Sequence, residues 1–213
     1  MKELKSRVDQ LIGGIQIQSK RKRGIGTLGC IVFDRLSGKP LGLTNKHILK
    51  KRRGFSVIQP ARKKRASEYI IGNIFRKGKN GKENDFAVFE INTNNRAINQ
   101  KNSLFGLAGK ITEFVEPEIG MLVQKVGQST GHTYGIIQKV SSKTIIIKGN
   151  PDKPCEEISI GGDSGSLWVT DEENFKAVAL HRAGEKNNTT TPIEDTAYAI
   201  PISRVLKELK IRF

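Results

Sequence analysis

A serine flanked by glycines is the residue of this chain best suited to covalent chemistry. Residues 161–166 read GGDSGS, and the apolar residues 167–169 follow at once. This pattern predicts a tight turn that presents Ser164 and leads into a buried strand. On such a turn the backbone N–H groups of Gly162 and Ser164 can stabilise the oxyanion that forms when a serine attacks a carbonyl carbon. Turns are rich in these residue types, so the motif requires partners elsewhere in the chain.

Two residues upstream fit the roles that a nucleophilic serine requires. His47 comes just after a predicted strand at residues 40–45, and Asp85 opens another predicted strand at residues 85–91. Acyl transfer needs a base that accepts the serine proton and an acid that orients this base. We therefore predict His47 as the general base and Asp85 as the orienting acid. Glu83 is a nearby competitor, but the apolar run after Asp85 favours Asp85.

The order His, Asp, Ser resembles that of bacterial trypsin-like serine peptidases of the chymotrypsin fold. Residues 26–32 (GTLGCIV) and 126–133 (VGQSTGHT) are similar to intracellular bacterial members of this group, and residues 179–184 (ALHRAG) resemble glutamyl endopeptidases. The resemblance extends over about residues 13–209, and the joint order of the short motifs makes it specific. It implies a serine endopeptidase that cleaves protein or peptide substrates through an acyl-enzyme on Ser164.

The resemblance also implies a pocket that binds the side chain of the substrate residue just before the cleaved bond. Ile158 stands where trypsin carries an acidic residue, so cleavage after Lys or Arg is not expected. Ser159 and His181 stand where glutamyl endopeptidases bind the substrate carboxylate, and Arg182 adds positive potential. These residues imply a preference for Glu, and less strongly for Asp or Gln. The alternative is that His181 only makes hydrogen bonds within its own barrel.

Asp163, directly before the predicted nucleophile, has no partner that the sequence identifies. In secreted trypsin-like enzymes this acid pairs with the N-terminus that activation cleavage creates. Residues 11–14 (LIGG) are superficially similar to such an N-terminus, but no basic residue immediately precedes Ile12 and nothing marks a pro-segment. A buried carboxylate without a partner is costly, so Asp163 requires another group.

Short apolar segments separated by turn residues predict an all-β protein. Further candidate strands lie at residues 15–18, 28–34, 56–58, 70–75, 121–126, 134–140, 144–148, 166–170, 176–181 and 196–201. The resemblance implies two six-stranded antiparallel Greek-key β-barrels with short N-terminal and C-terminal helices.

We divide the chain into three parts on this basis. Residues 1–14 form an N-terminal extension, in which Leu4, Val8 and Leu11 predict one face of a helix. Residues 15–108 form the first barrel, which carries the predicted base and orienting acid. Residues 109–213 form the second barrel, which carries the predicted nucleophile and ends in a helix at residues 204–209.

The formal net charge of +16 indicates an attraction to negatively charged partners. Basic clusters at residues 20–23, 50–53 and 62–65 predict salt-dependent contacts with phosphates, steering of acidic proteins, or simply solvated loops. They support an alternative function: a protease-like binding module for nucleic acid or an acidic protein, inactive or cleaving only itself. A regulatory protein partner also fits, because a free intracellular protease is hazardous.

Cysteine and histidine content argues against secretion and against a bound metal. The chain has only Cys30 and Cys155, which favours a reduced cytoplasmic protein over a disulfide-bonded one. Residues 1–10 contain no apolar signal segment, and no apolar run is long enough to span a membrane. The third histidine, His132, lies at a predicted hairpin, and the histidines and cysteines lack the spacing of zinc ligands. Residues 24–26 (GIG) lack the rest of a dinucleotide fingerprint, so we expect no cofactor.

Overall fold

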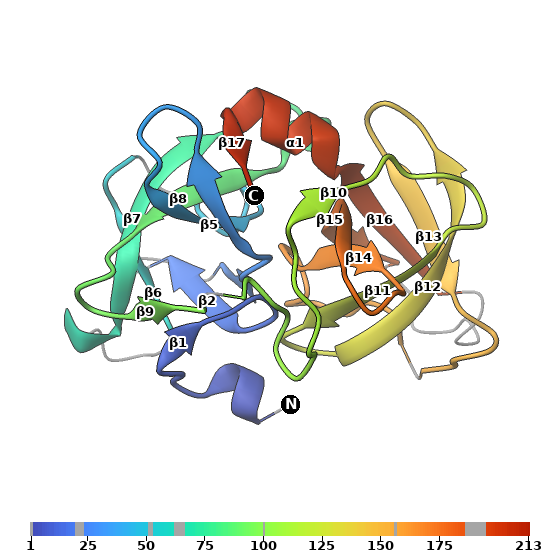
Figure 1. Cartoon of the computed structure of the whole chain (residues 1–213), viewed down its shortest axis with the longest axis horizontal. Helices are drawn as coiled ribbons and strands as arrows, with labels where there is room; N and C mark the ends of the chain where they lie inside the picture. Colours follow the sequence, from blue (N-terminus) through green and yellow to red (C-terminus); the bar gives the residue numbers. More distant parts are fainter. Residues whose placement is uncertain are drawn as a thin grey trace.

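The computed structural model describes residues 2–19, 24–50, 53–61, 67–99, 101–155, 157–185 and 195–213. Its strands form two antiparallel units that lie side by side (Figure 1). The first unit consists of β2 (Gln16–Ser19), β3 (Ile25–Thr27), β4 (Ile31–Asp34), β5 (Pro40–Thr44), β6 (Ser56–Ile58), β7 (Ile70–Lys77), β8 (Ala87–Ile91) and β17 (Ile211–Arg212). These strands follow the order β17-β4-β5-β8-β7-β6-β2-β3 in a curled half-barrel.

The second unit is a closed barrel built from the other half of the chain. It consists of β10 (Glu113–Phe114), β11 (Leu122–Gly127), β12 (Gly131–Val140), β13 (Ile145–Gly149), β14 (Leu167–Thr170), β15 (Lys176–Gly184) and β16 (Thr196–Pro201). Six strands close through pairing of β15 with β16, and β10 joins β15 as a parallel edge strand. The predicted all-β architecture is confirmed.

The predicted N-terminal helix is wrong in extent and type. This segment has only one short 3₁₀ helix, η1 (Glu3–Lys5), followed by β1 (Gln10–Leu11), which pairs in parallel with β9 (Ala97–Ile98). A short isolated helix is marginal in water, and here tertiary contacts replace its hydrogen bonds. The Gln59 side chain donates to the Ser6 carbonyl at 2.7 Å, and the Leu11 side chain is fully buried in the core of the first unit.

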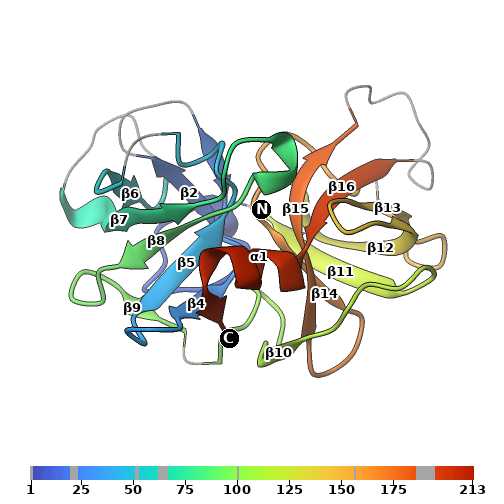
Figure 2. The same cartoon turned by 90° about the horizontal axis from the view of Figure 1, so that it is seen from above.

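The C-terminal helix, α1 (Ile202–Leu209), begins two residues earlier than predicted and lies across the junction of the two units (Figures 1 and 2). Strand β17 then returns the chain to the first unit, where it pairs with β4. One hydrophobic cluster contains Leu43 of β5, Leu180 of β15 and Leu206 of α1, among others. Because this cluster is shared, the two units are held in a fixed relation to each other, and so are the residues along their junction.

Two further 3₁₀ helices are η2 (Ser67–Tyr69) and η3 (Lys82–Asn84). Among the described residues, no helix has the length and apolar character needed to cross a bilayer. The basic clusters predicted at residues 20–23 and 62–65, and residues 51–52 of the remaining one, lie outside the described residues.

Candidate active site

One pocket brings together the side chains that the sequence assigned to chemistry and to substrate binding. It is lined by residues of both units: His47, Lys82, Asp85, Ser159, Ile160, Gly161, Ser164, His181, Arg182, Ala183, Gly184 and Glu185. His47 follows β5 and Asp85 follows η3, whereas Ser164 precedes β14 and His181 lies within β15. Segments far apart in the chain therefore meet at the junction of the two units.

His47 and Asp85 form a close, directional pair. The His47 ring Nδ1 lies 2.5 Å from Asp85 Oδ2, and the His47 backbone N–H donates to Asp85 Oδ1 at 2.9 Å. Asn45 fixes the same segment, because its side-chain amide donates to the Asp85 carbonyl at 2.7 Å. With the Nδ1 proton donated to the carboxylate, the ring Nε2 is left as an acceptor. The His47 side chain is 40% exposed and lines the pocket.

The Ser164 hydroxyl is held by the main chain in this structure. Its Oγ donates to the Arg182 carbonyl at 3.1 Å. Transfer of the hydroxyl proton to His47 therefore requires that this hydrogen bond be broken. The Arg182 guanidinium itself lies over the Tyr198 ring, 5.9 Å from the ring centre.

The turn around Ser164 has a conformation that requires glycine. Gly162 has a φ of +112°, and a Cβ there would overlap the side chains of Gln128 and Ser129. Thr27 anchors the turn by donating from Oγ1 to the Gly162 carbonyl at 2.9 Å. No acceptor among the described residues takes the backbone N–H of Gly162 or Ser164. These are the two donors that an oxyanion would require.

Lys125, which the sequence reasoning missed, is the partner that Asp163 requires. Both side chains are fully buried, and Lys125 Nζ lies 3.4 Å from Asp163 Oδ2. Asp163 also accepts from the backbone N–H of Ser129 and Ile160 and from the Thr130 hydroxyl. Burial alone would raise the pKa of Asp163, but Lys125 and the hydrogen bonds from Thr130 and Ser129 hold it below its ordinary value. An internal ammonium group thus anchors the turn that carries Ser164.

We predict that Lys125→Met lowers the free energy of unfolding by about 3–5 kcal/mol, because it leaves a buried carboxylate without its countercharge. Urea denaturation measures this loss. Lys153→Met is the control, since Lys153 forms an exposed ion pair with Asp171 at 2.6 Å and should cost less than about 1 kcal/mol. Equal losses in the two variants would show that the buried ion pair contributes no more to the free energy of unfolding than the exposed one.

His181 lies at the back of the pocket and is buried. Its Nε2 lies 2.8 Å from Ser159 Oγ, and the Trp168 indole N–H donates to its Nδ1 at 3.3 Å. Burial, reinforced by Lys125, lowers the pKa of His181 to about 3. Asp195, also missed in the sequence, fixes the segment that carries Ser159 by accepting from the backbone N–H of Ile158 at 2.7 Å and of Ser159 at 3.3 Å.

The buried neutral His181 predicts a pH dependence of stability. Its pKa of about 3 in the folded chain is well below the ordinary 6.5, so between these values the unfolded chain binds more protons. Stability should therefore fall as pH drops from 6.5, by up to about 1.4 kcal/mol per pH unit. Urea denaturation at several pH values measures this slope. In His181→Gln the slope should correspond to about one fewer proton bound on unfolding. An unchanged slope would contradict a neutral buried imidazole.

His132 is not part of the pocket lining. It lies at the start of β12, just after the turn from β11, and its Nε2 is 2.7 Å from Gln124 Oε1. The hairpin predicted there is confirmed. Both cysteines, Cys30 and Cys155, are free.

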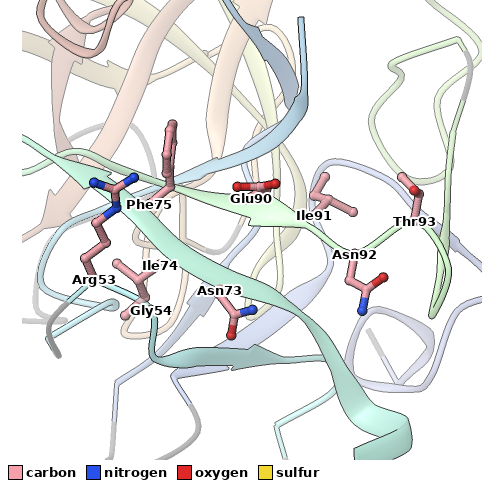
Figure 3. Close-up of a pocket in the computed structure, with 9 residues that line it drawn as sticks. All are labelled: Arg53, Gly54, Asn73, Ile74, Phe75, Glu90, Ile91, Asn92 and Thr93. Carbon is pink, nitrogen blue, oxygen red and sulfur yellow. The ribbon is translucent and has the colours of Figure 1, made fainter. Parts of the chain in front are cut away.

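A second hollow lies on the first unit, along β7 and β8 (Figure 3). Arg53 lies over the Phe75 ring there, 4.9 Å from its centre, and Glu90 is paired with Lys39 at 2.6 Å. Its described lining contains no serine, cysteine or histidine, and its two charged side chains already have partners. The junction pocket is therefore the better candidate for an active site.

Comparison with solved structures identifies bacterial chymotrypsin-fold serine proteases as neighbours. Nocardiopsis protease has a TM-score of 0.69 and 20% identity, over 95% of this chain and 98% of that chain. A glutamic-acid-specific serine protease that uses a histidine triad in substrate binding has a TM-score of 0.69 and 15% identity, over 94% and 98%. The chymotrypsin of Cellulomonas bogoriensis has a TM-score of 0.67 and 17% identity, over 96% and 98%.

These matches confirm the predicted chymotrypsin fold. No protein-family model and no curated protein sequence matches the chain.

Proposed function

We propose that this protein is a serine endopeptidase that hydrolyses peptide bonds through an acyl-enzyme on Ser164. The observation that carries the proposal is the hydrogen-bonded His47–Asp85 pair in the same pocket as Ser164. Nucleophile, base and orienting acid come from separate segments of the chain and line the same pocket. The fold shared with serine proteases supports the same assignment.

The reaction follows from the positions of these groups. Ser164 gives up its hydrogen bond to the Arg182 carbonyl, transfers its proton to His47 Nε2 and attacks the substrate carbonyl carbon. Asp85 stabilises the imidazolium that forms, and His47 then returns the proton to the leaving amine. A water molecule, activated by His47 in the same way, attacks the ester carbonyl and releases Ser164.

The backbone N–H groups of Gly162 and Ser164 are the donors for the oxyanion in both steps. Removal of one such donor typically costs about 2.7–4 kcal/mol of transition-state stabilisation. The buried Lys125–Asp163 pair fixes the turn that carries them, so the site does not depend on a newly cleaved N-terminus.

The pocket favours cleavage after a residue with an acceptor side chain, with Glu as the preferred residue. Ser159 supplies a hydrogen-bond donor, with His181 bonded to it, and Lys82 and Arg182 supply positive charge on a lining that also holds the acids Asp85 and Glu185. Ile158 is fully buried and neutral, so this position supplies no countercharge to a substrate Lys or Arg, and the lining acid Asp85 is already paired with His47.

A peptide library incubated with the protein, and with its Ser164→Ala variant as a blank, tests the proposal. We expect cleavage that depends on Ser164, with Glu and other acceptor side chains before the cleaved bond. Cleavage dominated by basic or large aromatic residues would refute the proposed preference. Identical peptide patterns for protein and blank would refute the endopeptidase assignment.

A further inference from the structure

A chain of buried hydrogen bonds runs through the specificity pocket. It begins at the Trp168 indole on β14, passes through the His181 ring on β15 and ends at the Ser159 hydroxyl. Trp168, His181 and Ser159 are 0%, 1% and 4% exposed. Of the three, Trp168 is absent from the pocket lining, so it lies behind the other two.

The chemistry of the indole fixes the direction of this chain. An indole N–H can only donate, so His181 Nδ1 must be unprotonated. The neutral ring then carries its proton on Nε2 and donates it to Ser159 Oγ. Within the described residues, no acceptor takes the Ser159 hydroxyl proton. This proton is therefore the outermost donor of the chain and can turn to an oxygen of a bound side chain.

The charges around His181 preserve the neutral ring. Burial is the main reason why the pKa of His181 is low. Lys125 on β11, the neighbouring Arg182 and the His47 ring also oppose a positive charge on His181. Asp163 acts in the opposite direction but is already paired with Lys125. A protonated His181 would also lose its hydrogen bond with the indole, because Nδ1 could no longer accept.

We infer that Trp168 is a positioning residue that holds His181 as a neutral donor, so that the pocket recognises an acceptor oxygen rather than a negative charge. Peptides with Gln before the cleaved bond are then substrates of the same class as those with Glu. This inference rests on the proposed endopeptidase function and narrows its specificity. Any remaining advantage of Glu comes from Lys82 and Arg182 on the pocket lining and is reduced by salt.

The comparison proteins show that this arrangement differs from a histidine-based pocket. The glutamic-acid-specific neighbour uses a histidine triad in substrate binding. This chain has three histidines in all, and His132 is bonded to Gln124 outside the pocket lining. Three histidines therefore do not meet here, and an indole occupies the place behind His181.

The first test is nitrogen NMR of the histidine rings in the intact protein between about pH 5 and pH 8. We expect His181 to remain neutral, with its proton on Nε2, over the whole range. In Trp168→Phe the Nδ1-protonated form should become populated, because the donor that excluded it is gone. Titration of His181 within this range in the unmodified protein would overturn the inference. The measurement does not depend on enzymatic activity.

The second test compares peptides that differ only in Glu, Gln or Leu before the cleaved bond, at about 0.5 M salt. We expect kcat/KM for Gln to lie within about tenfold of that for Glu. Trp168→Phe and Ser159→Ala should each lower the Glu and Gln values by about tenfold relative to the Leu value. Ser159→Ala is the matched variant, since it removes the last donor without changing the His181 proton. An advantage of Glu over Gln above about a hundredfold at this salt concentration would overturn the inference.

Labelling by a fluorophosphonate separates this inference from the proposed function. Unchanged labelling of Ser164 in both variants shows that nucleophile and base are intact, so the substrate-specific losses belong to the pocket. Failure of the unmodified, folded protein to react would instead refute the endopeptidase assignment, while the NMR result would still decide the state of His181.

Discussion

Ser164→Ala should lower kcat for peptide hydrolysis by about 10⁶-fold, because it removes the atom that forms the acyl-enzyme. Stability should change little. The lost hydroxyl makes a single hydrogen bond, to the Arg182 carbonyl, whereas the turn is anchored by the neighbouring Asp163 and its donors. Steady-state kinetics with a peptide cleaved by the unmodified protein gives the ratio, and urea denaturation gives the change in stability.

Ser166→Ala is the matched control for this variant. Ser166 belongs to the same GGDSGS motif, is fully buried, and its hydroxyl has no hydrogen-bond partner among the described residues. Its removal should leave kcat within about threefold of the unmodified value. An equal loss in both serine variants would mean that the motif is needed for folding rather than for chemistry.

Asp85→Asn should lower kcat by about 10⁴-fold without unfolding the protein. Asparagine retains an oxygen for the His47 backbone N–H, which now donates to Asp85 Oδ1 at 2.9 Å. Its amide group would then face His47 Nδ1 and donate to it, so that the ring proton moves to Nε2. In this tautomer the imidazole cannot accept the proton of Ser164. Kinetics with the same peptide, together with circular dichroism, measures the effect.

Glu83→Gln is the corresponding control, because Glu83 is the other carboxylate near the start of β8. Among the described contacts, His47 bonds to Asp85 and not to Glu83. We therefore expect normal activity in Glu83→Gln. Loss of activity in this variant with retention in Asp85→Asn would reverse the assignment of the orienting acid.

Most strands could be predicted because apolar segments and turn residues alternate clearly along the chain. β6 and β16 were predicted with their observed bounds, and α1 was short by two residues at its start. The short strands β1, β9 and β17 have two residues each and are formed by pairing with distant segments. Two residues carry no periodicity, so local sequence cannot indicate such strands.

The lining of the site was predictable for a different reason. Ser164, His47 and Asp85 have local motifs and a characteristic order, and the structure places them in one pocket. Lys125 and Trp168 had no such signal. Each lies within a strand, where the sequence alone gives no reason to assign it a role in the site. A search for a buried base to match Asp163 could have suggested a lysine within an apolar strand, such as Lys125 in β11.

The role of Ser164 as the nucleophile is measured by the mass of the protein, and of its peptides, after reaction with a fluorophosphonate. We predict one adduct per chain, located on Ser164, and a large loss of labelling rate in His47→Ala. An adduct on another residue would contradict the assignment of Ser164 as the nucleophile. So would a folded protein that does not react, or a rate that does not depend on His47.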